Sequence, residues 1–465
     1  MADLYVSTSG SDSNAGTKAS PFRTIEKASK VASAGTTVHV APGTYEGGFQ
    51  TTKSGTSSAP IRYVSDVKWG AKLVPGAGND QYEAWDNRGA NVIIDGFEVD
   101  GSVSKGGTPW LLGIYTAGSN SVVQNSKVHD IVRSSDAMSK ANSGGHGGAG
   151  IMGDGWSGGT NIKLLNNEVY NVGPAGESSS LVHGVYMATS GEVQNNVIGN
   201  VVGDGITTWH DATNVKILNN TVFEARGSGI LVGSGDHYNT NGPNDYTQVS
   251  NNIIYDNAKG IQEHGTIGSH NTYTNNLVYA NGSNWSLKNS SHSGTVSADP
   301  KFVKYVATGG GDYHLTSGSP AINAGTSSGA PSTDMTGANR VGAVDIGAYE
   351  YGSTSAPPPA PIPSTTTAKV VVNAKGTAAA GVNAHFKVLI DGKQIGEGTA
   401  GTTAKDFTFS GTVSANAAHK VQIQYDNDTV INGVDRNLFV NKVTINGKAV
   451  LPTASNVSYD KFALD

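Results

Sequence analysis

The feature that most constrains the fold is an irregular repeat of short apolar segments. A glycine precedes a β-branched residue at Gly113-Ile114, Gly150-Ile151, Gly184-Val185, Gly205-Ile206, Gly229-Ile230 and Gly260-Ile261. Asparagine pairs recur at Asn166-Asn167, Asn195-Asn196, Asn219-Asn220, Asn251-Asn252 and Asn275-Asn276, and successive pairs lie 24 to 32 residues apart. Short strands repeated at this spacing predict a solenoid in which every turn stacks on its neighbours. Since asparagine tolerates left-handed corners and can hydrogen-bond from turn to turn, we expect the pairs to shape corners.

Both ends of this region resemble the ends of known β-helices. Residues 5–48 (YVSTSGSDSNAGTK…APGTYEGG) resemble the opening of secreted right-handed β-helix proteins, in which a short helix, here around residues 24–31, caps the open core. Residues 299–351 resemble the segment that closes such solenoids. The resemblance places residues 1–351 with the pectate-lyase-like superfamily, which includes polysaccharide lyases, epimerases and some glycoside hydrolases. The calcium-aspartate and lysine pattern of family 9 pectate lyases is not found, so the resemblance concerns fold and end caps.

A second domain follows a linker. Residues 352–368 are rich in Pro, Ser and Thr, which predicts a semi-rigid extended segment without helix or sheet. In residues 369–465, runs such as HFKVLIDG and HKVQIQYD alternate polar and apolar residues, as in an antiparallel sandwich. The predicted fold class is therefore all-β, a right-handed parallel β-helix followed by a small antiparallel β-sandwich domain.

One motif in the second domain indicates calcium. Residues 424–447 (QYDNDTVINGVDRNLFVNKVTING) resemble the core motif of calcium-dependent family 60 xylan-binding modules. The resemblance implies calcium bound by Asn427, Asp428, Asp435 and Asn437. Calcium takes about six to eight oxygen ligands, and sugar hydroxyls can fill vacant positions. The alternative is that these Asn and Asp residues only hydrogen-bond a turn.

Composition excludes several classes of partner. The formal net charge of −6 argues against nucleic acid, because phosphate binding needs a basic surface. The absence of Cys excludes thiolate nucleophiles and Cys-ligated zinc. No apolar stretch approaches the roughly 20 residues of a membrane span, so we expect no membrane insertion. The opening MADLYVS reads like a start codon placed after a removed signal peptide, and we expect a secreted monomer whose partner is a polysaccharide.

Strand alternation predicts which side chains face outward. Positions two after each glycine hold Tyr115, Met152, Tyr186, Thr207, Leu231 and Gln262, and positions four after hold Ala117, Asp154, Ala188, Trp209, Gly233 and His264. The positions just before the glycines add His183, Asp204, Ser228 and Lys259. Adjacent turns place equivalent residues about 5 Å apart, so the polar and aromatic side chains of the middle turns should form one cluster.

This cluster suits cleavage of an acidic polysaccharide. β-Elimination needs a base, an acid for the leaving oxygen, and neutralisation of the uronate carboxylate. Our predicted catalytic residues are His183 or Lys259 as base, Tyr186 as acid or base partner, and His210 or His264, or else Arg226, as the group that neutralises the carboxylate. The predicted substrate-binding residues are Trp209, Arg226, Asp204, Glu263, Asp154 and His146. The insertions at residues 136–155 and 234–248 should wall the groove.

Two other readings stay open. A glycoside hydrolase would need two carboxylates beside the cleaved bond, and Asp204 with Glu263 or Asp154 are the candidates. A non-catalytic surface or matrix protein would only bind polysaccharide, and single histidines or lysines on a surface are usually just solvated. The sequence favours a secreted polysaccharide lyase that acts on a uronate-containing polysaccharide.

Overall fold

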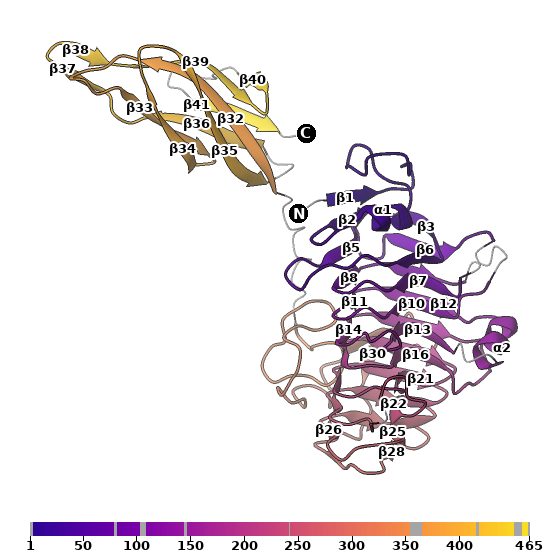
Figure 1. The fold of residues 1–465 in the computed structure, drawn as a ribbon. Coiled ribbons are helices and arrows are strands. Elements are labelled where there is room, and N and C mark those ends of the chain that lie inside the picture. Colours follow the sequence, from indigo (N-terminus) through magenta and orange to yellow (C-terminus); the bar gives the residue numbers. More distant parts are fainter. Residues whose placement is uncertain are drawn as a thin grey trace. The chain divides into compact units, whose positions relative to one another are not determined.

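The computed structural model describes residues 3–78, 81–102, 108–143, 147–240, 242–353, 365–414, 418–450 and 458–463. The chain divides into two compact units, Met1–Ala356 and Pro357–Asp465. The first is a coil of stacked parallel strands and the second consists of antiparallel strands, as Figure 1 shows. The predicted fold class, a parallel β-helix followed by an antiparallel sandwich, is confirmed.

Each turn of the coil contributes strands to three parallel sheets in a fixed order. The first sheet contains β1 (Asp3–Val6), β2 (Thr37–Val40), β5 (Ile61–Ser65), β8 (Val92–Asp95), β11 (Val122–Gln124), β14 (Ile162–Leu165), β17 (Gly191–Gln194), β20 (Val215–Leu218), β23 (Gln248–Ser250), β26 (Thr272–Thr274) and β29 (His292–Ser293). The second contains β3 (Gly43–Gly47), β6 (Ala71–Pro75), β9 (Glu98–Asp100), β12 (Lys127–Ile131), β15 (Glu168–Val172), β18 (Val197–Val201), β21 (Thr221–Ala225), β24 (Ile253–Tyr255) and β27 (Leu277–Tyr279). The third contains β4 (Phe49–Thr51), β7 (Glu83–Asn87), β10 (Leu112–Thr116), β13 (Gly148–Gly153), β16 (Val182–Met187), β19 (Ile206–Thr208), β22 (Ser228–Ser234), β25 (Lys259–Gly265) and β28 (Trp285–Ser286).

The second asparagine of each pair forms a buried ladder at the corner after the first sheet. Asn196 and Asn220 have no exposed surface. The side-chain oxygen of Asn220 accepts from both the main-chain and side-chain nitrogens of Asn196, each at 2.9 Å. Asn220 in turn donates to Asn252, and Asn252 to Asn276. A buried amide can satisfy the corner's main-chain groups in this way, which explains why asparagine recurs there.

The first asparagine of each pair has left-handed backbone, and four of the five, from Asn195 to Asn275, hold the closing segment. Asn195 and Asn219 have φ values of 55° and 54°. Their side chains donate to the carbonyls of Thr333 and Asp345, at 2.8 and 3.0 Å. This segment contains one hairpin, β30 (Phe302–Lys304) with β31 (Asp312–Leu315), and otherwise runs along the coil without regular strands. The asparagine pairs therefore have two separate structural roles.

The helix at the start of the chain covers the core. Helix α1 (Ile25–Val31) begins after Thr24, whose hydroxyl accepts from the backbone N–H of Lys27 at 3.1 Å. Ile25 and Ala28 are buried and belong to the same apolar core as the strands. The predicted cap is thus present at this end. A second helix, α2 (Ser135–Ser143), is inserted between β12 and β13.

The C-terminal unit has two four-stranded antiparallel sheets and a hairpin. Its strands are β32 (Thr365–Gly376), β33 (Ala384–Ile390), β34 (Lys393–Ala400), β35 (Lys405–Ser414), β36 (Ala418–Tyr425), β37 (Thr429–Ile431), β38 (Val434–Arg436), β39 (Leu438–Ile445), β40 (Lys448–Val450) and β41 (Ser458–Ala463). Most of the predicted linker, residues 354–364, lies outside the described residues. Its last four residues differ from the prediction, because residues 365–368 begin β32 and pair with β35. Threonine is common in strands, but the Pro- and Ser-rich composition of the linker hid this strand signal.

Neither helix in the described ranges is long and apolar enough to cross a membrane.

Candidate functional site

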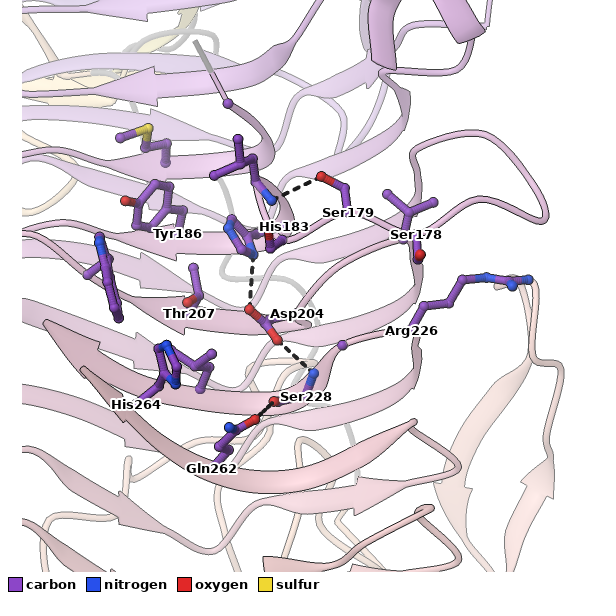
Figure 2. Close-up of a pocket in the computed structure, with 18 of the residues that line it drawn as sticks. Ser178, Ser179, His183, Tyr186, Asp204, Thr207, Arg226, Ser228, Gln262 and His264 are labelled. Carbon is purple, nitrogen blue, oxygen red and sulfur yellow. Dashed lines mark hydrogen bonds and ion pairs between the residues drawn. The ribbon is translucent and has the colours of Figure 1, made fainter. Parts of the chain in front are cut away.

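A cleft of about 850 Å³ opens on the outer face of the third sheet, where β16, β19, β22 and β25 lie side by side. It gathers most of the predicted site residues, as Figure 2 shows in part. The predicted residues that line it are His183, Tyr186, Asp204, Trp209, His210, Arg226, Lys259 and His264.

The strand register accounts for this gathering. Tyr186 pairs with Met152 on one side and Thr207 on the other, and Leu231 pairs with Gln262. The outward column predicted from the glycine positions is therefore the column that forms. Chemistry-bearing residues at equivalent positions of successive turns meet because parallel strands stack about 4.8 Å apart.

A line of polar contacts crosses the cleft floor from His183. Nδ1 of His183 lies 3.4 Å from Oδ2 of Asp204, although among the described residues it has no partner with hydrogen-bond geometry. Oδ1 of Asp204 accepts from the backbone N–H of Ser228 at 2.6 Å. The Ser228 hydroxyl donates to Gln262 at 3.0 Å, and the Lys259 ammonium donates to the same oxygen at 3.3 Å. A carboxylate beside Nδ1 favours the tautomer that leaves Nε2 as the acceptor.

Tyr186 stands beside His183, with ring centroids 5.3 Å apart. Burial, together with Tyr238 and nearby Asp154 and Asp236, raises the pKa of the Tyr186 hydroxyl well above its usual value. In the part of the chain that the structure describes, this hydroxyl has no hydrogen-bond partner. Tyr186 therefore carries its proton at neutral pH and is chemically an acid.

His210 is held as a neutral imidazole. Its Nδ1 lies 2.7 Å from the backbone carbonyl of Asp236, and its ring stacks on Tyr238 with centroids 3.8 Å apart. A carbonyl accepts, so Nδ1 carries the proton. Burial lowers the pKa of His210, with the Asp236 carbonyl and nearby carboxylates opposing that shift. A neutral imidazole is a poor counter-charge for a uronate, which weighs against the predicted neutralising role.

The far end of the cleft is more open and more basic. His264 is exposed and stacks on half-buried Trp209, with centroids 5.7 Å apart. Arg226 and Lys259 are exposed cations on its border. Aromatic faces next to cations are suited to stacking on a sugar ring and pairing with its carboxylate.

Three predicted residues lie elsewhere. The predicted substrate-binding role of Glu263 is not supported, because its side chain is 1% exposed and accepts from Tyr273 and Ser290. Glu263 is the third residue after the glycine, and this position points inward. Asp154 directly follows β13, is buried and accepts from the Tyr115 hydroxyl, and it is not among the residues that line the cleft. His146 lies outside the described residues. The predicted hydrolase pairing of Asp204 with Glu263 is therefore wrong, since the two carboxylates face opposite sides of the sheet.

The loops around the cleft supply further lining residues, partly from the insertion at residues 234–248 that was expected to wall the groove. Asp211 accepts from the backbone N–H groups of Tyr238 and Asn239, which holds the loop after β22 over the cleft. This loop adds Asp236 and Tyr238 to the lining, and the segment before β16 adds residues 178–181. Loop positions do not follow the strand register, so the insertion's length and its Tyr238 pointed to this loop, whereas Asp236 and residues 178–181 carried no sequence signal.

The predicted calcium residues lie around the hairpin β37–β38. Asp428 and Asp435 are exposed, and Asn437 donates its amide to Asp435 at 3.0 Å, which leaves its amide oxygen available. Asn427 is already engaged, because its amide accepts from the His385 backbone and donates to the Asn383 carbonyl. Buried Arg436 donates to the carbonyls of Asn427, Ala379 and Val382 and so fixes the backbone next to the hairpin. The oxygen-rich hairpin fits a hard cation.

Comparison with known proteins bears on each unit. Residues 369–460 match a family model described as Ca-dependent carbohydrate-binding module xylan-binding, which confirms the predicted resemblance of this unit to family 60 modules. Residues 8–54 match a model described as Protein of unknown function (DUF1565).

Relatives match short parts of the chain. The uncharacterized protein YwoF of Bacillus subtilis (strain 168) is 52% identical over 60 residues, which are 13% of this chain and 13% of that protein. Pectate lyase PEL9 of Emericella nidulans is 41% identical over 103 residues, 22% of this chain and 20% of that protein. The chain thus spans a fifth or less of the relatives that it matches. The solved structure of pectate lyase Pel9A is 17% identical, with a TM-score of 0.47, over 75% of this chain and 96% of that one. The PEL9 match agrees with the predicted resemblance to pectate-lyase-like β-helix proteins.

Proposed function

We propose that the β-helix unit is a secreted polysaccharide lyase that cleaves a uronate-containing polysaccharide by β-elimination. The observation that carries the proposal is the placement of His183, paired with Asp204, beside the protonated hydroxyl of Tyr186. An acceptor nitrogen and a proton donor next to each other are what an elimination requires.

In the proposed step, Nε2 of His183 takes the proton from the sugar carbon next to the carboxylate. The electron pair of that C–H bond forms a carbon–carbon double bond, and the bond from the adjacent carbon to the glycosidic oxygen breaks. Tyr186 gives its proton to the leaving oxygen, and His183 returns a proton to Tyr186 through solvent before the next turnover. Asp204 stabilises the imidazolium of His183 in between.

The basic side chains at the open end, of which Arg226 and Lys259 are cations, fit the substrate carboxylate. Arg226, Lys259 and His264 border the cleft, and a positive charge near the uronate carboxylate stabilises the negative charge that develops when the proton leaves. Trp209 offers a face for stacking. Lys259 is the alternative base, but its ammonium donates to Gln262.

The test is a panel of uronate and neutral polysaccharides, followed by ultraviolet absorbance of the unsaturated product together with reducing ends. A lyase raises both signals. Reducing ends alone would indicate a hydrolase, and the absence of both signals would leave a binding protein. His183→Gln should remove both signals, whereas His39→Gln should keep them, because His39 forms a similar pair with Asp66 on the first sheet.

We further propose that the C-terminal unit binds polysaccharide through calcium held by Asp428, Asp435 and Asn437, with Asn427 holding the loop. Bound calcium would supply positions for sugar hydroxyls. Titration of the chelator-treated full chain with calcium, by calorimetry, should give binding heat that Asp428→Asn with Asp435→Asn abolishes. Glu397→Gln, a change on exposed β34, should leave the heat unchanged. Equal heat in the double variant would contradict the assignment.

A further inference from the structure

The outer face of the third sheet changes from covered to open along the coil. On β10, Leu112 and Tyr115 face outward but are each only 6% exposed. On β13, Ala149 is 0% and Met152 is 8% exposed. On β25, by contrast, Lys259 at the position equivalent to Leu112 and Ala149 is exposed, Gln262 at the position equivalent to Tyr115 and Met152 is half-buried, and His264 two residues further along is exposed. The most exposed part of this face is therefore at β25, the end of the cleft away from β13.

Contacts between loops explain the covered part. Tyr186 and Tyr238 pack on the outward apolar cluster of β10 and β13. Trp156 meets Tyr238 edge to face, with centroids 4.9 Å apart. The Asn239 amide donates to the Gly155 carbonyl at 3.1 Å, which ties the loop after β22 to the loop after β13. These contacts build a wall at the β13 end of the cleft, which we call the Trp156–Tyr238 wall.

The border of the cleft opposite the Trp156–Tyr238 wall is also held in place next to β16. The Ser179 hydroxyl donates to the Asn142 side chain at 2.6 Å, which joins the segment before β16 to α2. Ser178 and Ser179 line the cleft in Figure 2 on the side away from Tyr186 and His264. Both borders of the cleft are therefore fixed next to β16.

The proposed reacting groups lie at this closed end. His183 and Tyr186 are both on β16, the strand next to the wall, whereas Gln262 and His264 lie on β25 at the other end of the row (Figure 2). Three stacking steps separate β16 from β25, about 14 Å at the usual strand spacing. Most of the binding surface thus lies on one side of the bond that His183 and Tyr186 would break.

We propose that the cleft takes the end of a polysaccharide chain, so that the β-helix unit releases short products from chain ends. This inference rests on the proposed lyase function. The wall leaves room for little sugar beyond β16, while the rest of the chain extends over β19, β22 and β25 and past the exposed His264. An enzyme that cuts within chains would need open surface on both sides of the reacting groups.

The inference is tested by measuring the size of the products during the first few per cent of cleavage. The substrate is the polymer that gives unsaturated product in the panel assay. We expect one short unsaturated product from the start, with the polymer's size distribution and viscosity nearly unchanged. A ladder of intermediate oligomers with an early fall in viscosity would overturn the inference and leave the lyase proposal intact. If no polymer yields an unsaturated product, both the chain-end inference and the lyase proposal are contradicted.

A variant of the wall tests its cause. Trp156→Ala with Asn239→Ala should shift the initial products to longer oligomers and raise the loss of viscosity per bond cleaved several-fold. Trp156 is 65% exposed, so its removal should leave the fold intact, which thermal unfolding can verify. The matched control is Tyr279→Ala, an exposed aromatic residue on β27 of the second sheet. An unchanged product pattern in the double variant would contradict the role of the wall.

Discussion

The carboxylate of Asp204 lies between His183 and Ser228, with Oδ2 3.4 Å from Nδ1 of His183 and Oδ1 2.6 Å from the Ser228 nitrogen. Asp204 is only 7% exposed. Its buried carboxylate is therefore in a position to orient the imidazole of His183. The strand pattern predicts a substrate-binding role for Asp204, but these contacts favour a positioning role behind His183. The distinction can be measured, because a positioning residue affects turnover more than affinity.

Asp204→Asn should lower kcat by about 10²- to 10⁴-fold with little change in KM, because an amide neither stabilises the imidazolium nor selects the tautomer. The amide oxygen can still accept from Ser228, so the fold should be retained. Steady-state kinetics on the polymer cleaved by the wild type provide the measurement. Asp66→Asn breaks the comparable pair with His39 and should leave kcat within about two-fold. A higher KM with unchanged kcat would instead support direct substrate binding.

Tyr186→Phe should lower kcat by at least about 10²-fold and leave the free energy of unfolding within about 0.5 kcal/mol, because the lost hydroxyl has no described partner. The raised pKa of Tyr186 keeps its proton in place through the neutral and mildly alkaline range. A pH profile of kcat should therefore show no alkaline fall due to Tyr186 below about pH 10. A rate that rises toward high pH would mean that the tyrosinate acts as the base. Tyr279→Phe on the second sheet is the matched control.

His210 should make the protein less stable in acid. Burial lowers the pKa of folded His210, so the unfolded chain binds the proton more readily. Its contribution to stability is complete above the unfolded pKa, about 6.5, and is lost as pH falls through that value toward the folded pKa. His210→Asn keeps a residue that tolerates φ of 52° and removes the titration. Urea unfolding at pH 7.5 and pH 5 should show a smaller stability loss in the variant, and an equal loss would contradict the assignment.

Asn220→Ala should lower the free energy of unfolding by about 3 kcal/mol, because it leaves several buried main-chain groups without partners. The Asn220 side chain accepts from the Asn196 backbone and donates to the Val193 carbonyl. Asn339→Ala, at an exposed position of the closing segment, should change stability by less than about 0.5 kcal/mol. Urea denaturation of both variants gives the comparison. Equal stabilities would show that water replaces the ladder.

Periodicity made the strands and their outward columns predictable. Once a glycine marks the start of each strand, the alternation of side chains places Tyr186 and Thr207 in the same outward-facing column, independently of the loop lengths. The same rule, applied strictly, places Glu263 inward, so its assignment to the cleft came from its sequence neighbours and not from the register. The two insertions were expected to wall the groove, but the contact that closes the β13 end was not predictable, since Trp156 and Tyr238 meet across loops about 80 residues apart in the chain. Side-chain pairs such as His183 with Asp204 needed actual distances as well.

The closing segment contacts the outer asparagines of several turns in succession. Its backbone accepts from Asn275 at Ala324, from Asn251 at Thr326, and from Asn195 at Thr333. A stack of repeats tends to fray one repeat at a time, since each touches only its neighbours. Here the last turn cannot detach without disturbing a segment that is also bonded to turns much nearer the middle. The end of the coil beside the open side of the cleft should therefore melt together with its centre, in one cooperative transition.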